Sequence, residues 1–184
     1  MGRKLSFRIL AQLWAAGACI CSAGPIGIFF SEESSRRELF PAYDRAEHDT
    51  LRIDDSTAAR AKVLMKGPIA EKQAVFERVL SKQGIAGYIY RAREMGKVEP
   101  MDFAVSLDGE GRILRVVLTA YRESIGGEVK SKRFMGQFKG KHCGSSLQLN
   151  RDIDGITGAT LSSRAITIGV RKAVCFWKLK YGTY

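Results

Sequence analysis

Residues 102–121 read DFAVSLDGEGRILRVVLTAY. Two runs of mainly apolar, β-branched and aromatic residues, 102–107 and 113–121, flank the connection Asp108-Gly109-Glu110-Gly111-Arg112. A short Gly-bearing connection between two such runs is typical of a β-hairpin. Four aliphatic residues are expected on its core-facing side: Val105, Leu107, Val116 and Leu118. This stretch therefore predicts antiparallel β-structure at the centre of the fold.

The segments around this hairpin add strands before it and helices on both sides. Two further strand runs, 72–80 and 85–93, are separated by a short turn. Helices are expected over about 55–66, 130–138 and 163–178. The last of these has an apolar face at helical spacing, formed by Ile166, Val170, Ala173, Val174 and Trp177. The pattern predicts an α+β domain, a small antiparallel sheet with packed helices.

Composition describes a folding chain with a strong positive charge. The 184 residues are 45% hydrophobic and 27% charged, with a formal net charge of +11. This excludes a disordered chain, and four cysteines are too few for a disulfide scaffold. Residues 72–184 carry +10 and residues 31–71 carry −2. An anionic ligand, a membrane surface or nucleic acid would each suit the basic part, and a solvated basic face explains it equally well.

The N-terminal run predicts a membrane segment. The 22 residues from Ile9 to Phe30 carry no charge, three basic residues precede them, and Glu32 and Glu33 follow. About 20 apolar residues suffice to cross a bilayer, and the charge asymmetry places the N-terminus in the cytoplasm. A cleaved signal peptide is the alternative. Either reading puts residues 31–184 outside the cytoplasm.

The expected organisation has three parts: an anchor or signal peptide over 1–30, a linker with the first helix over 31–71, and the main domain over 72–184. Cys143 and Cys175 lie in the exported part and could pair, although two cysteines alone are weak grounds for a disulfide. The sequence contains neither a CxxC pair nor a CxxCH haem site, and the two histidines, His48 and His142, lack neighbouring ligands at metal-binding spacing. No metal site or catalytic residue is predicted.

The segment richest in chemistry is Asp154-Gly155-Ile156-Thr157-Gly158-Ala159-Thr160, followed by Leu161-Ser162-Ser163. It is a loop of small residues that leads into the last helix. Glycines allow close approach of a ligand to the backbone. The unpaired N–H groups of a helix N-terminus, with nearby hydroxyls, suit an anion such as phosphate. Ser and Thr are also ordinary helix caps, so the loop alone leaves both readings open.

The ordered pattern Asp154-x-x-Thr157-Gly158-Ala159-Thr160 resembles the flavinylation motif of FMN-binding domain proteins. That family includes the covalent-FMN subunits of the Rnf complex and of the sodium-translocating NADH:quinone oxidoreductase. The resemblance extends over most of residues 40–175. It includes a hairpin, a Glu- and Gly-rich loop and a Phe-x-Gly-Lys segment, at 108–113, 121–128 and 138–141. Ser124-Ile125-Gly126-Gly127 departs from the Pro-Gly-Leu-Gly loop of the Rnf-type subunits.

The resemblance implies FMN attached covalently through a phosphoester to the hydroxyl of Thr160. It also implies a cofactor-binding site around that residue, comprising Asp154, Thr157, Gly158, Ala159, Leu161, Ser162 and Glu123. Aromatic residues such as Tyr121, Phe134 and Phe138 would suit flavin stacking, but at strand and helix spacing they are equally suited to the core. No attachment machinery is visible in the chain, so a separate Mg²⁺-dependent FAD:protein FMN transferase is implied.

The function implied is that of a single-pass, membrane-anchored electron-transfer flavoprotein with its C-terminal domain in the periplasm. Its expected partners are membrane redox subunits, quinone-linked modules or cytochromes. The alternative is a structural or sensor subunit that binds FMN or another phosphate ligand without a covalent bond. A nucleic-acid-binding role is not expected, because an export signal is present and no recognition motif is visible.

Overall fold

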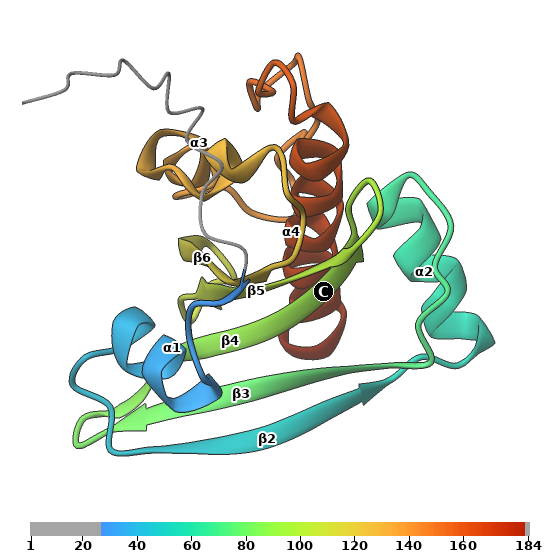
Figure 1. The fold of residues 1–184 in the computed structure, drawn as a ribbon. Helices are drawn as coiled ribbons and strands as arrows, with labels where there is room; N and C mark the ends of the chain where they lie inside the picture. The colour runs from blue at the N-terminus through green and yellow to red at the C-terminus, as the bar shows by residue number, and fades with distance from the viewer. Residues whose placement is uncertain (1–26, 183–184) are drawn as a thin grey trace, which may run out of the picture.

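The computed structural model describes residues 27–182, and its centre is a six-stranded antiparallel sheet (Figure 1). The strands are β1 (Gly27–Ile28), β2 (Arg45–Arg52), β3 (Gln73–Ser81), β4 (Gly84–Met95), β5 (Pro100–Leu107) and β6 (Ile113–Tyr121). From β2 to β6 each strand pairs with the next along the chain, and β1 pairs with β6 at the far edge. The predicted α+β class with a small antiparallel sheet is confirmed.

The predicted hairpin is formed by β5 and β6, with Val105 opposite Val116. Its turn is held by Asp108, whose Oδ1 accepts hydrogen bonds from the N–H groups of Glu110 (2.9 Å) and Arg112 (2.8 Å). Gly111 has φ +75°, and a Cβ there would overlap the Trp177 ring. The turn therefore needs glycine for both its backbone conformation and its packing.

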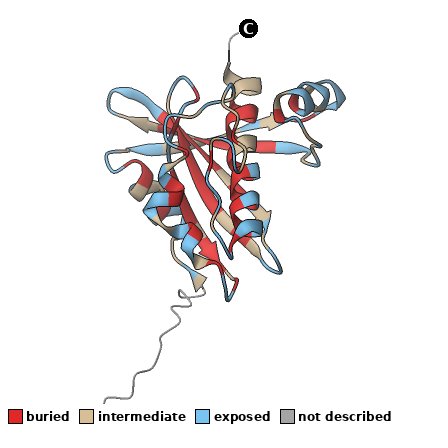
Figure 2. Ribbon diagram, turned by 90° about the horizontal axis from the view of Figure 1, so that it is seen from above, coloured by how far each residue is buried: buried red, intermediate tan, exposed pale blue. Residues whose placement is uncertain are grey.

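Three helices cover one face of the sheet: α2 (Asp55–Met65), α3 (Lys132–Gly136) and α4 (Thr160–Tyr181). Their buried faces meet the sheet in the larger core (Figure 2). All four core positions predicted on the hairpin and all five on the last helix are buried there. The segment predicted as one helix over 130–138 divides into a 3₁₀ turn, Gly127–Lys130, and α3, because Ser131 caps α3 through a bond from the Phe134 N–H.

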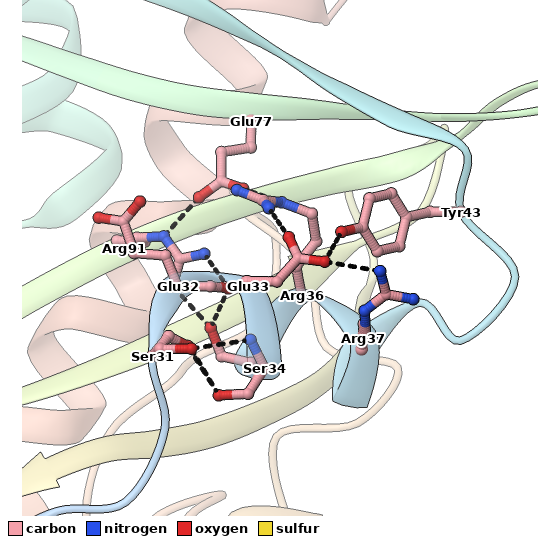
Figure 3. Close-up of polar contacts among 10 residues, drawn as sticks. Ser31, Glu32, Glu33, Ser34, Arg36, Arg37, Tyr43, Glu77 and Arg91 are labelled. Carbon is pink, nitrogen blue, oxygen red and sulfur yellow. Dashed lines mark hydrogen bonds and ion pairs between the residues drawn. The ribbon is translucent and has the colours of Figure 1, made fainter.

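The opposite face carries α1 (Glu32–Leu39) and a smaller core that includes Val79, Ile89 and Val117. A buried ionic cluster holds α1 there (Figure 3). The carboxylate of Glu77 on β3 is 3% exposed and binds two guanidinium groups, Arg36 Nε at 2.7 Å and that of Arg91. Because burial of a carboxylate requires partners of this kind, the cluster determines where α1 packs.

Residues 31–71 contain more structure than the expected linker and helix. They form α1, β2 and α2, and β2 pairs with the whole length of β3, from Arg45 opposite Leu80 to Arg52 opposite Gln73. The β2 sequence RAEHDTLR lacks apolar alternation, and none of its residues is fully buried, as suits an edge strand. Periodicity therefore provided no signal for this strand.

The N-terminal prediction lies largely outside the described residues. Of the uncharged run 9–30, the structure describes residues 27–30, and these join the sheet: β1 pairs with β6, and the N–H groups of Phe29 and Phe30 donate to the Thr119 carbonyl. Within residues 27–182, no helix combines the length and the hydrophobicity needed to cross a bilayer.

Candidate functional site

The motif loop turns sharply into α4. The N–H of Ala159 donates to the Ile156 carbonyl at 2.9 Å, and Gly158 has φ +82°. A side chain at Gly158 would be strained by this left-handed backbone, although the space around it is open. The turn leaves Thr157 and Thr160 exposed, whereas Ala159 is buried.

The N-terminus of α4 has no side-chain cap. Ala159 is the N-cap residue and the first helical bond runs from the Ser163 N–H to the Ala159 carbonyl, at 2.9 Å. The N–H groups of Thr160, Leu161 and Ser162 therefore precede the helical hydrogen bonds and carry the positive end of the helix dipole. α4 begins three residues before its predicted start, so the hydroxyl of Thr160 lies in its first turn.

Two hydroxyls of the motif face the protein interior. Ser162 Oγ lies 3.4 Å from Tyr121 Oη, and Ser163 Oγ accepts a hydrogen bond from the Ile156 N–H at 3.3 Å. Both serines are buried. They fix the loop against β6 and α4, so of the four hydroxyls in the segment only those of Thr157 and Thr160 belong to exposed residues.

Gln137, at the C-terminal end of α3, holds the start of the motif. Its Nε2 donates to the Asp154 carbonyl at 3.1 Å, and its Oε1 accepts from the Asp154 N–H at 2.7 Å. The Asp154 side chain stays exposed beside a cavity of about 310 Å³ that Glu128, Phe134 and Thr157 also line. No sequence pattern pointed to Gln137, because an amide that pairs with backbone 17 residues away leaves no local signal.

A second cavity, of about 520 Å³, adjoins Thr160 on the side of Arg164 and Arg171. Arg164 follows Thr160 by one helical turn, so the two residues share a face of α4. Arg171 donates to the carbonyls of Met65, at 3.2 Å, and Leu147. The exposed Thr160 thus shares a helix face with Arg164 and lies at the positive N-terminal end of the helix.

The loop after β6 packs directly on the motif. Tyr121 Oη donates to the Ile125 carbonyl at 2.5 Å, and Gly126 has φ +86°. A Cβ at Gly126 would lie 2.9 Å from Tyr121 Oη and 3.2 Å from Ala159 Cβ. Two apolar residues of these neighbouring segments remain exposed, Ile125 at 75% and Leu161 at 48%. They offer apolar surface near Thr160.

Glu123, expected near the cofactor, has its carboxylate on another loop. Its Oε1 accepts hydrogen bonds from the N–H groups of Val98 (2.8 Å) and Glu99 (3.1 Å), in the turn between β4 and β5. Burial alone would raise the pKa of this carboxyl, but these N–H donors lower it below its usual value. The structure therefore gives Glu123 a role in holding this turn.

Part of the chain is similar in sequence to known proteins. Residues 96–175 match the family model of the FMN-binding domain. The chain is 27% identical over 94 residues to one of the proteins that make up the proton-translocating ferredoxin:NAD(+) oxidoreductase complex of Clostridium ljungdahlii, and the match covers 47% of this chain and 51% of the relative. The chain thus spans about half the length of that curated relative. The predicted resemblance to FMN-binding domain proteins is confirmed.

A solved structure extends the likeness to most of the fold. One of the proteins of the Na(+)-translocating NADH-quinone reductase from Parabacteroides distasonis superposes with a TM-score of 0.54, covering 85% of this chain and 87% of the other. The two sequences are 18% identical, so this likeness concerns the fold alone.

Proposed function

We propose that this chain, whose residues 96–175 match the FMN-binding domain, is an electron-transfer flavoprotein that carries FMN covalently on Thr160. The observation that supports this proposal most directly is the position of Thr160. Thr160 is exposed, it occupies the first turn of α4, and the helix end has no side-chain cap. A phosphate esterified to its hydroxyl would supply the negative charge that this helix end lacks.

The residues around Thr160 fit FMN in chemistry. The N–H groups of the first turn and the guanidinium of Arg164 would hold the phosphate. The exposed apolar side chains of Ile125 and Leu161 would contact the ring system. Bound FMN would accept and donate one or two electrons. The protein's own part is to hold the cofactor at a fixed point on a rigid helix.

Attachment requires a second protein. An FAD:protein FMN transferase would join the FMN phosphorus to Thr160 Oγ1 and break the pyrophosphate bond of FAD, so that AMP leaves and the hydroxyl proton passes to solvent. The open space at Gly158 and the exposure of Asp154, Thr157 and Thr160 support access by such an enzyme. The buried Ser162 and Ser163 are unsuitable acceptors by the same criterion.

We place the flavoprotein at the cell membrane, with the uncharged residues 9–26 as the anchor and the folded domain, which begins at β1, in the periplasm. Support comes from the uncharged run with its charge asymmetry, and from a relative that belongs to a redox complex. Membrane redox subunits, quinone-linked modules or cytochromes are the partners that suit this location.

The alternative is noncovalent binding of FMN or another phosphate ligand at the same helix end, by a structural or sensor subunit. The two readings separate on denaturation. Protein purified after co-expression with the transferase is unfolded in guanidinium and passed through a desalting column. Covalent attachment predicts flavin absorbance in the protein fraction. Flavin found only among the small molecules would overturn it in favour of the alternative.

A further inference from the structure

Two thiols from distant parts of the chain meet beside α4. Cys143 Sγ lies 3.5 Å from Cys175 Sγ, although the residues are 32 positions apart. Cys175 lies on α4 and is 1% exposed, whereas Cys143 is partly exposed. Both are free thiols in this structure. The separation exceeds a disulfide bond length by an amount that small side-chain movements can close.

The turn that carries Cys143 is fixed on both sides. The Ser145 N–H donates to the His142 carbonyl at 2.8 Å, and the His142 N–H donates to Ser145 Oγ at 3.1 Å. Just before the turn, the Ile113 N–H at the start of β6 donates to the Lys141 carbonyl at 2.8 Å. The contact between the two sulfur atoms thus joins two well-anchored elements, the start of β6 and α4.

The two thiols differ in access and in acidity. Cys143 lines a cavity of about 480 Å³ that includes Lys66, Arg151 and Arg171. The pKa of Cys143 is lowered by its hydrogen bond with Cys175 and by the charge of Lys178, against the effect of burial. The Cys143 thiol and the burial of Cys175 raise the pKa of the latter. Cys143 is therefore the thiol that meets an outside reagent.

We infer that Cys143 and Cys175 are a disulfide-forming pair, oxidised by exchange with an external disulfide, either a small molecule or a thioredoxin-fold oxidant. The Cys143 thiolate attacks the external disulfide and displaces one thiolate. Cys175 loses its proton to solvent and attacks Cys143 Sγ, which closes the internal bond and releases the second thiolate. The pair loses two electrons and two protons, and the external disulfide becomes two thiols.

The bond would enclose the motif. Residues 154–160 lie between the two cysteines, so the disulfide closes a chain segment that contains Thr160. Such a cross-link restricts the unfolded chain, and a loop of this length predicts a rise in Tm of about 10 °C. The inference depends on no cofactor, so it stands or falls independently of the proposed flavin.

The test uses the full chain with Cys19 and Cys21 changed to Ser, so that two thiols remain. The protein is equilibrated with glutathione disulfide, denatured, alkylated with iodoacetamide and mapped by mass spectrometry, while a second sample is first reduced. We expect a Cys143–Cys175 peptide in the oxidised sample, two alkylated cysteines in the reduced one, and a Tm about 10 °C higher after oxidation. Two alkylated cysteines in both samples would overturn the inference.

Single variants test which of the two thiols reacts first with the external disulfide. Cys175→Ser should retain one glutathione on Cys143, whereas Cys143→Ser should retain little on the buried Cys175. Glutathione on Cys175 in preference to Cys143 would contradict the assignment of the entry thiol. The comparison with and without oxidant, made on the chain with Cys19 and Cys21 changed to Ser, keeps both Cys143 and Cys175, so a folding defect of either single variant leaves the test of the bond intact.

Discussion

Gln137 binds both backbone groups of Asp154, donating to its carbonyl at 3.1 Å and accepting from its N–H at 2.7 Å. This pair connects the end of α3 to the first residue of the motif that leads into α4. The buried Ser163 also holds the loop, because its Oγ accepts a hydrogen bond from the N–H of Ile156, two residues after Asp154. The motif loop is therefore held by side chains that come from outside it and from the first turn of the helix.

Gln137→Ala removes both hydrogen bonds to Asp154. We expect the free energy of unfolding to fall by about 1 kcal/mol, because these bonds are solvent-accessible and water replaces them in part. Attachment of FMN should become slower, since the loop loses its fixed position. Urea denaturation and the rate of flavin incorporation check this. Gln83→Ala, at an exposed turn residue, is the control. Equal rates of FMN attachment in the two variants would contradict a role of the Gln137–Asp154 hydrogen bonds in positioning the loop.

Gly126→Ala places a methyl group between the loop and the motif. The positive φ and the close approach to Tyr121 Oη and Ala159 Cβ predict a loss of about 1–3 kcal/mol in unfolding free energy. Gly109→Ala is the matched control, because its Cβ meets nothing within 4 Å. Thermal unfolding should separate the two variants by several degrees. A Gly126→Ala protein as stable as the control would contradict the contact between loop and motif.

Glu123→Gln tests whether this residue stabilises the β4–β5 turn. The pKa of Glu123 is lowered in the folded protein, so its contribution to stability is fully present above the unfolded pKa of about 4.3 and is lost as the pH falls through the lower folded value. We expect the variant to lose about 1–2 kcal/mol at pH 7 and the difference from wild type to shrink below about pH 4.

Two comparisons make the Glu123 result specific. Glu110→Gln, at a side chain that is 76% exposed, is the control for removing a carboxylate from the surface. Flavin attachment in Glu123→Gln should equal wild type, because the carboxylate accepts from Val98 and Glu99. Loss of flavin with unchanged stability would instead assign Glu123 to the cofactor.

The parts of the fold with strong local patterns were predictable. The β5–β6 hairpin has alternating aliphatic residues and a glycine turn, and α4 has a continuous apolar face. β2 was missed because an edge strand buries little and needs no alternation. The start of α4 was placed three residues late, since Ser162 and Ser163 resemble caps although their hydroxyls bind Tyr121 and the Ile156 N–H.

The candidate site was predictable in its motif and less so in its supports. Thr160 and Asp154 are both exposed and each lines a cavity, so both side chains are accessible from outside the protein. Gln137 and Arg164 were not identified from sequence, because tertiary contacts and the helix register bring them to the site. The resemblance implied that Ser162 and Glu123 are cofactor contacts, and the structure shows both bound to other parts of the chain.

The most direct test of the central claim is peptide mapping of protein co-expressed with an FAD:protein FMN transferase. Wild type and Thr160→Ser are expected to carry the mass of FMN less one water on residue 160, since both retain a hydroxyl. Thr157→Ala is the control for the neighbouring exposed hydroxyl and should retain attachment at residue 160, whereas Thr160→Ala should carry none. An unmodified residue 160 in wild type, or the same mass increment on Thr160→Ala, would contradict the account.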